Sequence, residues 1–170
     1  MPRNIRPIRV EGNVAFITLT KGYVAIIDVD DVERVQSFSW RALVVYSNVY
    51  GQCDFPRNSG PRPFALLHRL IMNAPKGFDV DHINCNSLDN RKSNMRICTH
   101  SENLCNQRAR KDAVSPFKGV SLAKCKIKWR ARIFVSGVET SLGQFDTEQE
   151  AHAAYCTASA QIHKDFGRTK

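Results

Sequence analysis

The chain has 170 residues and a formal net charge of +9, which suits one ordinary domain or two or three small modules with an anionic partner. No apolar run approaches the length of a membrane span, and no positively charged start leads into an apolar signal core, so we expect a cytosolic protein with reduced thiols and no membrane partner. The six cysteines show no Cys-x-x-Cys spacing, which argues against a zinc ribbon.

The N-terminal segment opens with a pattern typical of paired strands. Residues 14–20 and 23–27 are apolar runs on either side of Lys21-Gly22. Two such runs around a glycine-containing turn predict an antiparallel strand pair.

Helix and strand signals continue through the rest of this segment. Residues 30–33 carry a capping signal, which predicts a short helix ending near Trp40. Residues from Ala42 to Tyr50 have a strand-like pattern. An irregular stretch rich in Pro, Gly and Asn follows and runs through Pro63. We expect residues 1–63 to pack against the next module rather than to act alone.

Two short strands are predicted next. Residues 80–83 suit a strand that ends in an Asn-rich turn, and residues 95–99 suit a second strand. Adjacent residues of an ideal strand point to opposite sides, yet Asp81 and His82 must both approach one site for them to act together. The first strand is therefore expected to end or to bulge at this pair.

A helix is predicted to follow the second strand. Thr99 and Glu102 have the spacing of a capping box, which places Asn103 in the first helical turn. Asn103, Asn106 and Arg110 then share one helix face.

Four polar side chains, at positions 81, 82, 94 and 103, form the strongest candidate site. A carboxylate, an imidazole and two amides can bind one hard metal ion, orient one histidine and activate one water, which are the parts needed to hydrolyse a phosphodiester. An isolated Asp-His pair would more often be an ordinary exposed pair, Asn94 a turn residue and Asn103 a solvated helix residue. Their combined spacing favours the catalytic interpretation.

Residues 64–110 resemble the HNH endonucleases of phages and mobile introns. The resemblance rests on Leu67-His68-Arg69-Leu70, Val80-Asp81-His82-Ile83-Asn84, Leu88-Asp89-Asn90-Arg91, Ser93-Asn94-Met95-Arg96 and Ser101-Glu102-Asn103-Leu104. It implies two strands and a helix around one Mg²⁺ or Mn²⁺, with Asp81 and Asn103 as metal ligands, and cleavage to 5′-phosphate and 3′-hydroxyl ends. It also implies that His82 is the general base and that Asn94 holds the base.

Three residues of this module stand apart from that assignment. Cys85 departs from the family, whose members usually carry glycine in the turn, although the asparagines around it tolerate left-handed backbone. His68 lies in an apolar run, so a hydrogen-bonded core histidine and one that faces DNA both remain open. Asn106 is a further possible site residue because it shares the face of Asn103.

The positive charge is concentrated in one part of the chain. Residues 91–136 hold twelve Lys or Arg against two acidic residues, a net charge of +10, and the rest of the chain carries −1. This placement is what an enzyme that works along a phosphate backbone requires, although a solvated basic face without a partner is the alternative. The candidate DNA contacts are Arg91, Arg96, Arg108, Arg110, Lys118, Lys126, Lys128, Arg130 and Arg132.

Residues 111–116 read as a linker, and residues 117–166 resemble the plant ethylene-response-factor (APETALA-type) DNA-binding domain. The matching text is Phe117-Lys118-Gly119-Val120, Lys128-Trp129-Arg130-Ala131-Arg132-Ile133, Leu142-Gly143-Gln144-Phe145-Asp146-Thr147 and Glu150-Ala151-His152-Ala153-Ala154-Tyr155. The resemblance implies a three-stranded antiparallel sheet that enters the major groove, with a long helix behind it. The first strand lacks the arginines of the plant domain, so the base preference does not transfer.

Periodicity in this module supports the same arrangement. Four basic residues alternate with four apolar ones along residues 126–133, which predicts a strand with a DNA-facing side and a core side. The core side would hold Ile127, Trp129, Ala131 and Ile133. A capping box at Thr147 and Glu150 predicts a helix whose apolar face holds Ala151, Ala154, Tyr155, Ala158 and Ile162.

These patterns predict an α+β protein. A small N-terminal antiparallel sheet (1–63) and a ββα-metal nuclease core (64–110) precede a linker (111–116) and a three-stranded sheet packed on one long helix (117–170). We expect a monomeric, site-directed nicking endonuclease for double-stranded DNA. One alternative is a DNA-binding transcription regulator with an inactive nuclease core. An enzyme for RNA or damaged DNA is another, which the sheet module disfavours because the major groove of an RNA helix is too narrow to admit it.

Overall fold

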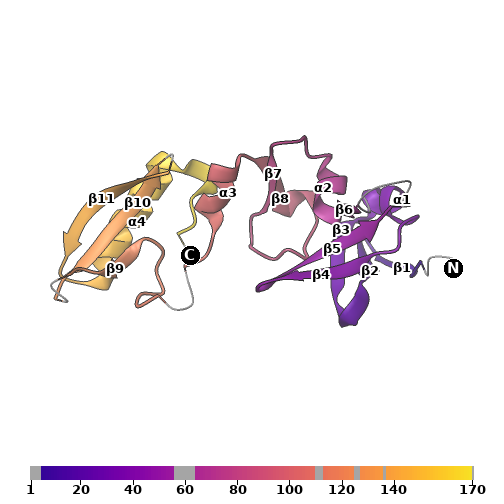
Figure 1. Cartoon of the computed structure of the whole chain (residues 1–170), viewed down its shortest axis with the longest axis horizontal. Helices are drawn as coiled ribbons and strands as arrows, with labels where there is room; N and C mark the ends of the chain where they lie inside the picture. The colour runs from indigo at the N-terminus through magenta and orange to yellow at the C-terminus, as the bar shows by residue number, and fades with distance from the viewer. Residues whose placement is uncertain (1–4, 56–63, 110–112, 125–126, 136, 170) are drawn as a thin grey trace. The chain divides into compact units, whose positions relative to one another are not determined.

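A computed structural model describes residues 5–55, 64–109, 113–124, 127–135 and 137–169 of the protein. The chain has a mixed α+β fold of small antiparallel sheets and short helices, as the sequence predicts. Two compact units divide it, Met1–Cys98 and Thr99–Lys170 (Figure 1). The division falls before Thr99, ahead of the predicted linker at residues 111–116, so the helix that follows Thr99 belongs to the C-terminal unit.

The first unit opens with a three-stranded antiparallel sheet. Its strands are β1 (Ile8–Glu11), β2 (Val14–Thr18) and β3 (Val24–Asp28). The short turn η1 (Thr20–Gly22) connects β2 to β3, and Lys21 takes a left-handed φ of 62° there. The predicted strand pair around Lys21-Gly22 is confirmed. One face of the pair is buried and holds Ala15, Ile17, Ala25 and Ile27.

The short helix after β3 ends earlier than the sequence predicts. The 3-10 turn η2 (Val29–Asp31) leads into α1 (Val32–Val35), and no side-chain hydrogen bond caps either one. Trp40 is buried, and its indole N–H donates to the carbonyl oxygen of Val35 at 3.0 Å. The prediction of a helix up to Trp40 is wrong, because this indole closes the helix end instead of continuing the helix.

The first unit continues with a second antiparallel sheet and a helix. The strands are β4 (Arg41–Val45), β5 (Asn48–Asp54) and β6 (Phe64–Leu66), and the helix is α2 (Leu67–Met72). The strand-like run from Ala42 to Tyr50 is therefore a hairpin that turns at Tyr46, where φ is 52°. The buried face of α2 carries Leu67, His68 and Ile71.

Strands β7 (Asp79–His82) and β8 (Met95–Cys98) form a separate two-stranded antiparallel sheet. A loop of residues 83–91 and the 3-10 turn η3 (Lys92–Asn94) connect them, and α2 packs against both strands. Both predicted strands are confirmed. β7 ends at His82, as the sequence predicts, and its register with β8 shows no bulge.

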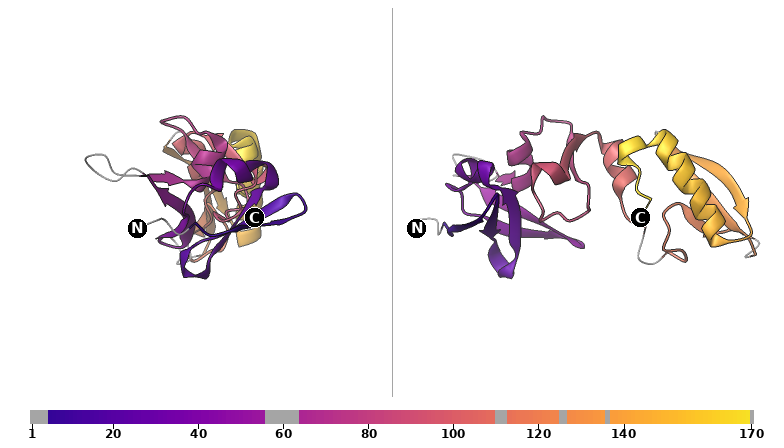
Figure 2. Two further views of the ribbon diagram at one scale, coloured as in Figure 1. Left: turned by 90° about the vertical axis from the view of Figure 1, so that its right-hand side faces the viewer. Right: turned by 180° about the vertical axis from the view of Figure 1, so that it is seen from behind.

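The second unit consists of α3 (His100–Asn106), a three-stranded antiparallel sheet and the long helix α4 (Glu148–Ile162), followed by η4 (Lys164–Phe166). The sheet strands are β9 (Val120–Leu122), β10 (Trp129–Val135) and β11 (Val138–Phe145). α4 covers one face of the sheet, as the front and back views show (Figures 1 and 2). Both predicted capping boxes, at Thr99 and Thr147, are present.

Two apolar residues of this unit are not buried as predicted. β10 begins at Trp129, and Ile127 before it is 79% exposed, because the strand alternation is imposed only inside the sheet. Ile162 is 42% exposed at the last position of α4. Ala131, Ile133, Ala151 and Tyr155 are buried as expected. No helix of the described residues is both long enough and apolar enough to cross a membrane.

Candidate active site

Asp81 and His82 are buried at the end of β7, with 5% and 7% of their surfaces exposed. The strand register places Asp81 directly opposite Arg96 in β8, and cross-strand partners share a face of the sheet. The Nε and Nη2 atoms of Arg96 donate to Oδ2 of Asp81 at 2.9 and 2.7 Å. The carboxylate expected to bind metal therefore forms an ion pair with an arginine expected to bind DNA.

The ring of His82 contacts Asn90, a fully buried residue of the loop. Nε2 of His82 lies 3.3 Å from Oδ1 of Asn90, and Nδ2 of Asn90 donates to the carbonyl oxygen of Leu88 at 3.1 Å. This second bond fixes which end of the amide faces the ring. Because an amide oxygen only accepts, neutral His82 must carry its proton on Nε2, which leaves the lone pair on Nδ1.

Asn94 bonds to the loop. Its Oδ1 accepts from the backbone N–H of Asn84 at 3.0 Å, and its Nδ2 donates to Oδ1 of Asn84 at 3.0 Å and to the carbonyl oxygen of Asp89 at 2.8 Å. These bonds draw the two ends of the 83–91 loop together. The sequence suggested that Asn94 holds the base. In this structure the side chain of Asn94 instead bonds to the loop from which Asn90 reaches His82.

The loop is also tied to the two N-terminal sheets. The carbonyl oxygen of Leu88 accepts from Ile26 N–H at 2.8 Å, and Asn90 N–H donates to the carbonyl oxygen of Ile26 at 2.7 Å. Ser87 exchanges two hydrogen bonds with the backbone of Val49 in β5, at 3.2 and 2.8 Å. Strands β3 and β5 of the N-terminal segment thus hold Ser87, Leu88 and Asn90 in place. The Leu88 carbonyl, which orients the Asn90 amide, is fixed with them.

Two charged groups and one strained residue complete the loop. Arg91 donates to both carboxylate oxygens of Asp89 at 2.7 Å, and this pairing holds the pKa of Asp89 below its usual range. Arg91, expected to contact DNA, is therefore an ion-pair partner in this structure. Cys85, where the family usually has glycine, takes a left-handed φ of 57°. The conformation expected of glycine is kept in spite of the side chain, at a cost of about 1–2 kcal/mol.

His68 lies against the ring of His82. It is 6% exposed, and its ring stands edge-on to that of His82 with centroids 5.3 Å apart. Burial lowers the pKa of His68 to about 3 and also lowers the pKa of His82, although the Asn90 contact and the carboxylates of Asp81 and Asp89 oppose the shift in His82. His68 is thus a core histidine, but its Nδ1 has no hydrogen-bond partner.

The donor atoms suit one hydrated divalent ion. Among the described residues, no group of three or more His, Cys, Asp and Glu could cage a metal. Mg²⁺ takes hard oxygen ligands, needs only one or two carboxylates from the protein and keeps several waters. The buried carboxylate of Asp81 could supply one such oxygen ligand in place of its ion pair with Arg96.

Asn103 lies on α3, which belongs to the second unit. It is half-buried in the first helical turn, where its N–H donates to the carbonyl oxygen of Thr99 at 3.0 Å, and Asn106 on the same helix is buried. Lys118 donates to the carbonyl oxygens of Leu104 and Cys105 at 3.1 and 2.6 Å. Lys118, expected to contact DNA, therefore caps the C-terminal end of the helix that carries Asn103.

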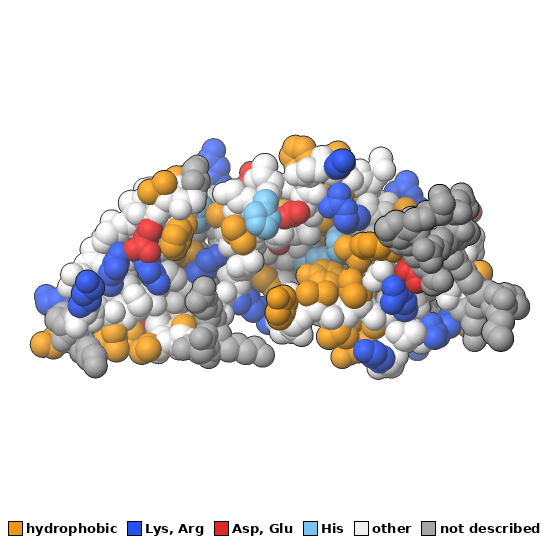
Figure 3. Space-filling view, in the orientation of Figure 1, with side chains coloured by type: hydrophobic (Ala, Val, Ile, Leu, Met, Phe, Trp, Pro, Cys, Tyr) orange, Lys and Arg blue, Asp and Glu red, His pale blue; other side chains and the backbone are white. Residues whose placement is uncertain are grey.

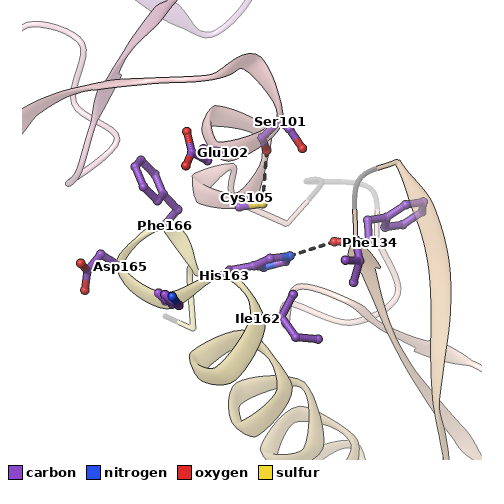
Figure 4. Close-up of a pocket in the computed structure, with 10 residues that line it drawn as sticks. Ser101, Glu102, Cys105, Phe134, Ile162, His163, Asp165 and Phe166 are labelled. Atoms are coloured by element: carbon purple, nitrogen blue, oxygen red, sulfur yellow. Dashed lines mark hydrogen bonds between the residues drawn. The ribbon is translucent and has the colours of Figure 1, made fainter.

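A pocket of about 380 Å³ lies beside the same helix (Figure 4). Its walls come from α3, the end of β10 and the segment after α4, and His163 reaches across it to bond the carbonyl oxygen of Phe134 at 2.8 Å. None of the four predicted catalytic side chains lines it. The predicted catalytic residues therefore lie outside the lining of this pocket.

The sheet of the second unit carries basic side chains on the face away from α4, with acidic ones among them (Figure 3). Arg130 and Arg132 both pair with Glu139 of β11, the latter at 2.8 Å, and Lys128 pairs with Asp146 at 3.1 Å. The predicted alternation along β10 holds here, because Ala131 and Ile133 are buried on the other face. Arg108 is exposed. Arg110 and Lys126 lie outside the described residues.

Asn90 is a contact of His82 that sequence reasoning did not assign. Its motif, Leu88-Asp89-Asn90-Arg91, belongs to the text that resembles the nuclease family, so the signal was present in the sequence. The role is not visible there, because it depends on how the loop folds back onto His82.

Comparison with known proteins agrees with this geometry. A family model described as HNH endonuclease matches residues 65–105, which contain β7, β8 and α2. Protein 3.8 of Escherichia phage T7 is 30% identical over 94 residues, which are 55% of this chain and 77% of that protein. An uncharacterized HNH endonuclease, L560, of Acanthamoeba polyphaga mimivirus is 25% identical over 162 residues, which are 91% of this chain and 80% of that protein. No solved structure matches.

The family match covers β7, β8 and the helix α2 that packs against both strands. The phage relative extends the similarity over most of its own length. The chain therefore belongs to the HNH endonuclease family, a family of phosphodiester-cleaving nucleases.

Proposed function

We propose that the protein is a metal-dependent endonuclease that nicks one strand of double-stranded DNA at sites selected by its C-terminal sheet. The observation that carries the proposal is the buried His82, whose Nε2 faces an amide oxygen and whose Nδ1 therefore carries the lone pair. A general base needs a neutral ring held in one tautomer. Burial favours that neutral form, since it lowers the pKa of His82.

In the proposed reaction, Nδ1 of His82 takes a proton from water as the water oxygen attacks phosphorus. The bond from phosphorus to the 3′ oxygen breaks, and the departing oxygen takes a proton from a solvent water, which leaves 5′-phosphate and 3′-hydroxyl ends. Asn90 holds the ring, and Asn94 holds the loop that carries Asn90. Asp81 and Asn103 would hold one Mg²⁺ or Mn²⁺, which when bound supplies positive charge to the scissile phosphate and the departing oxygen.

The C-terminal sheet would bind the duplex. Its exposed face carries Arg130 and Arg132, whose planar guanidinium groups can bind phosphates or the edge of guanine. Support comes from the three-stranded sheet backed by a helix, the arrangement that the resemblance to the plant DNA-binding domain implies. In this proposal the acidic partners of these basic residues yield to DNA phosphates on binding.

One chain carries one catalytic set, so we propose that the monomer cuts one strand per encounter. We also propose that it acts in the cytosol of the cell, or of the host cell if a phage encodes it.

The test is incubation of supercoiled plasmid with the protein in Mg²⁺, in Mn²⁺ and in chelator. We expect open-circle DNA to accumulate before linear DNA in either metal, and no cleavage in chelator. His82→Ala should slow cleavage by about 10²–10⁴-fold while DNA affinity stays the same, because it removes the base and no phosphate contact. Wild-type rates in His82→Ala would refute the assigned base. Linear product at a rate that rises with the square of enzyme concentration would refute the monomer.

A second candidate function is DNA-binding regulation with a lapsed nuclease core. The Arg96–Asp81 ion pair favours it, because a carboxylate neutralised by arginine binds metal less readily. The same plasmid assay separates the two functions, since a regulator would bind the plasmid and leave it supercoiled in every metal.

A further inference from the structure

Three aromatic rings form a row that ends at the proposed base. The ring of His68, on α2, stands at 77° to that of His82 with centroids 5.3 Å apart, and Tyr50, on β5, packs against His68 with centroids 5.4 Å apart. The three rings come from three different elements of the first unit. His68 and His82 are both buried, so neither ring is turned out to solvent.

His68 touches the base through its ring alone. The two rings pack edge-on, and Nδ1 of His68 is buried without a hydrogen-bond partner. Because burial lowers the pKa of His68 to about 3, its ring is neutral at physiological pH and cannot take the proton from His82. Its effect on His82 must therefore be exerted by shape and contact.

The contact with Asn90 acts at one end of the His82 ring, where Nε2 lies 3.3 Å from the amide oxygen. The edge-on ring of His68 adds a steric contact that opposes rotation of the His82 ring about its Cβ–Cγ bond. Tyr50 packs behind His68 and keeps it from receding.

We propose that His68 is a positioning residue of the nuclease, which sets the plane of the His82 ring so that Nδ1 points at the attacking water. The proposal rests on the proposed function, in which His82 is the base. Misplacing a reacting group by about 1 Å can cost roughly 10²-fold in rate. The contact therefore has a large expected effect on turnover and little on DNA binding.

The kinetic test compares His68→Ala with His68→Phe. We expect His68→Ala to lower kcat by about 10–100-fold with KM for DNA unchanged, because the base can pivot while the DNA-binding face is intact. His68→Phe should restore most of kcat, since it keeps the ring and removes a buried polar atom that has no partner. Val35→Ala is the matched control, because it empties a fully buried site on α1 and should leave kcat unchanged at temperatures where the protein is folded.

A second readout does not depend on cleavage. Nitrogen-15 NMR of labelled histidine reports which ring nitrogen of His82 carries the proton. We expect one tautomer, protonated on Nε2, in the wild type and in His68→Phe, and averaged shifts in His68→Ala.

Several results would overturn the proposal. A single unchanged tautomer and wild-type kcat in His68→Ala would do so, as would a His68→Phe variant as slow as His68→Ala, or an equal loss of kcat in Val35→Ala. If the proposed function itself is wrong, His82→Ala will cleave DNA at the wild-type rate. The NMR comparison would still decide whether His68 orders the ring of His82.

Discussion

The two units use polar side chains in opposite ways. Around β7 the polar groups are buried and bonded in fixed directions, so that even the tautomer of His82 follows from its neighbours. On the C-terminal sheet Arg130 and Arg132 are more than a third exposed and share one carboxylate, Glu139. Buried groups hold a geometry without reorganising, as catalysis requires. Exposed ion pairs contribute little to stability and can be exchanged for phosphate.

The largest expected effect that would test this contrast comes from Asn90. Asn90→Leu keeps the side-chain size but removes the acceptor from Nε2 of His82, so the ring loses its fixed tautomer. We expect a fall in kcat of about 10²-fold, near the upper range for loss of a residue that orients a functional histidine. Plasmid nicking at saturating DNA measures it. The control is Asn13→Ala, an exposed turn residue of the same unit. A kcat as high in Asn90→Leu as in Asn13→Ala would show that the buried network does not orient the base.

Changes to the exposed arginines of the C-terminal sheet should alter DNA affinity and leave the rate of the cleavage step unchanged. Arg130→Ala with Arg132→Ala should weaken duplex binding by roughly tenfold per lost charged contact and flatten the slope of log affinity against log salt by about 0.9 for each phosphate lost. Glu139→Gln should act in the opposite direction, because it releases both arginines. Filter-binding titrations at several salt concentrations measure both. An unchanged slope in the double variant would mean that this face does not meet DNA.

The smallest expected effect concerns stability and pH. Burial depresses the pKa of His68 in the folded protein from 6.5 to about 3. Below pH 6.5 the unfolded chain binds a proton that folded His68 does not, so the free energy of unfolding falls as the pH drops toward 3, at most by about 1.4 kcal/mol per pH unit. His68→Phe has no titrating group at this position, so its free energy of unfolding should fall less between pH 7 and pH 4. Urea unfolding of both proteins measures the difference, and parallel pH dependences would show that His68 is not buried as a neutral ring.

Local signals in the sequence were sufficient for the strands and helices that frame the site. β7 and β8 follow from short strand-like stretches on either side of an Asn-rich turn, and α3 and α4 from the capping boxes at Thr99 and Thr147. These elements depend on residues within a few positions of each other, so they can be predicted from the local sequence. Ile127 shows the limit, because alternation buries a residue only where strand pairing continues.

The contacts within the site could not be predicted in the same way. The Arg96–Asp81 pair depends on the register of β7 with β8, and the Asn90–His82 contact depends on the path of a nine-residue loop tied to β3 and β5. His68 reaches His82 only because α2 packs across both strands. The resemblance to the nuclease family supplied the candidate residues, and tertiary packing decides which of them touch.

The capping of α3 by Lys118 has a consequence for how such proteins can be recombined. The last carbonyl oxygens of the helix that carries Asn103 are satisfied from the C-terminal module, by Lys118 and by the N–H of Arg168, which donates to Cys105 at 3.3 Å. A chimera joined at residues 111–116 would inherit the helix and discard both donors. A crossover placed before Thr99 would keep helix and donors together, so a graft that exchanges the recognition module should carry α3 with it.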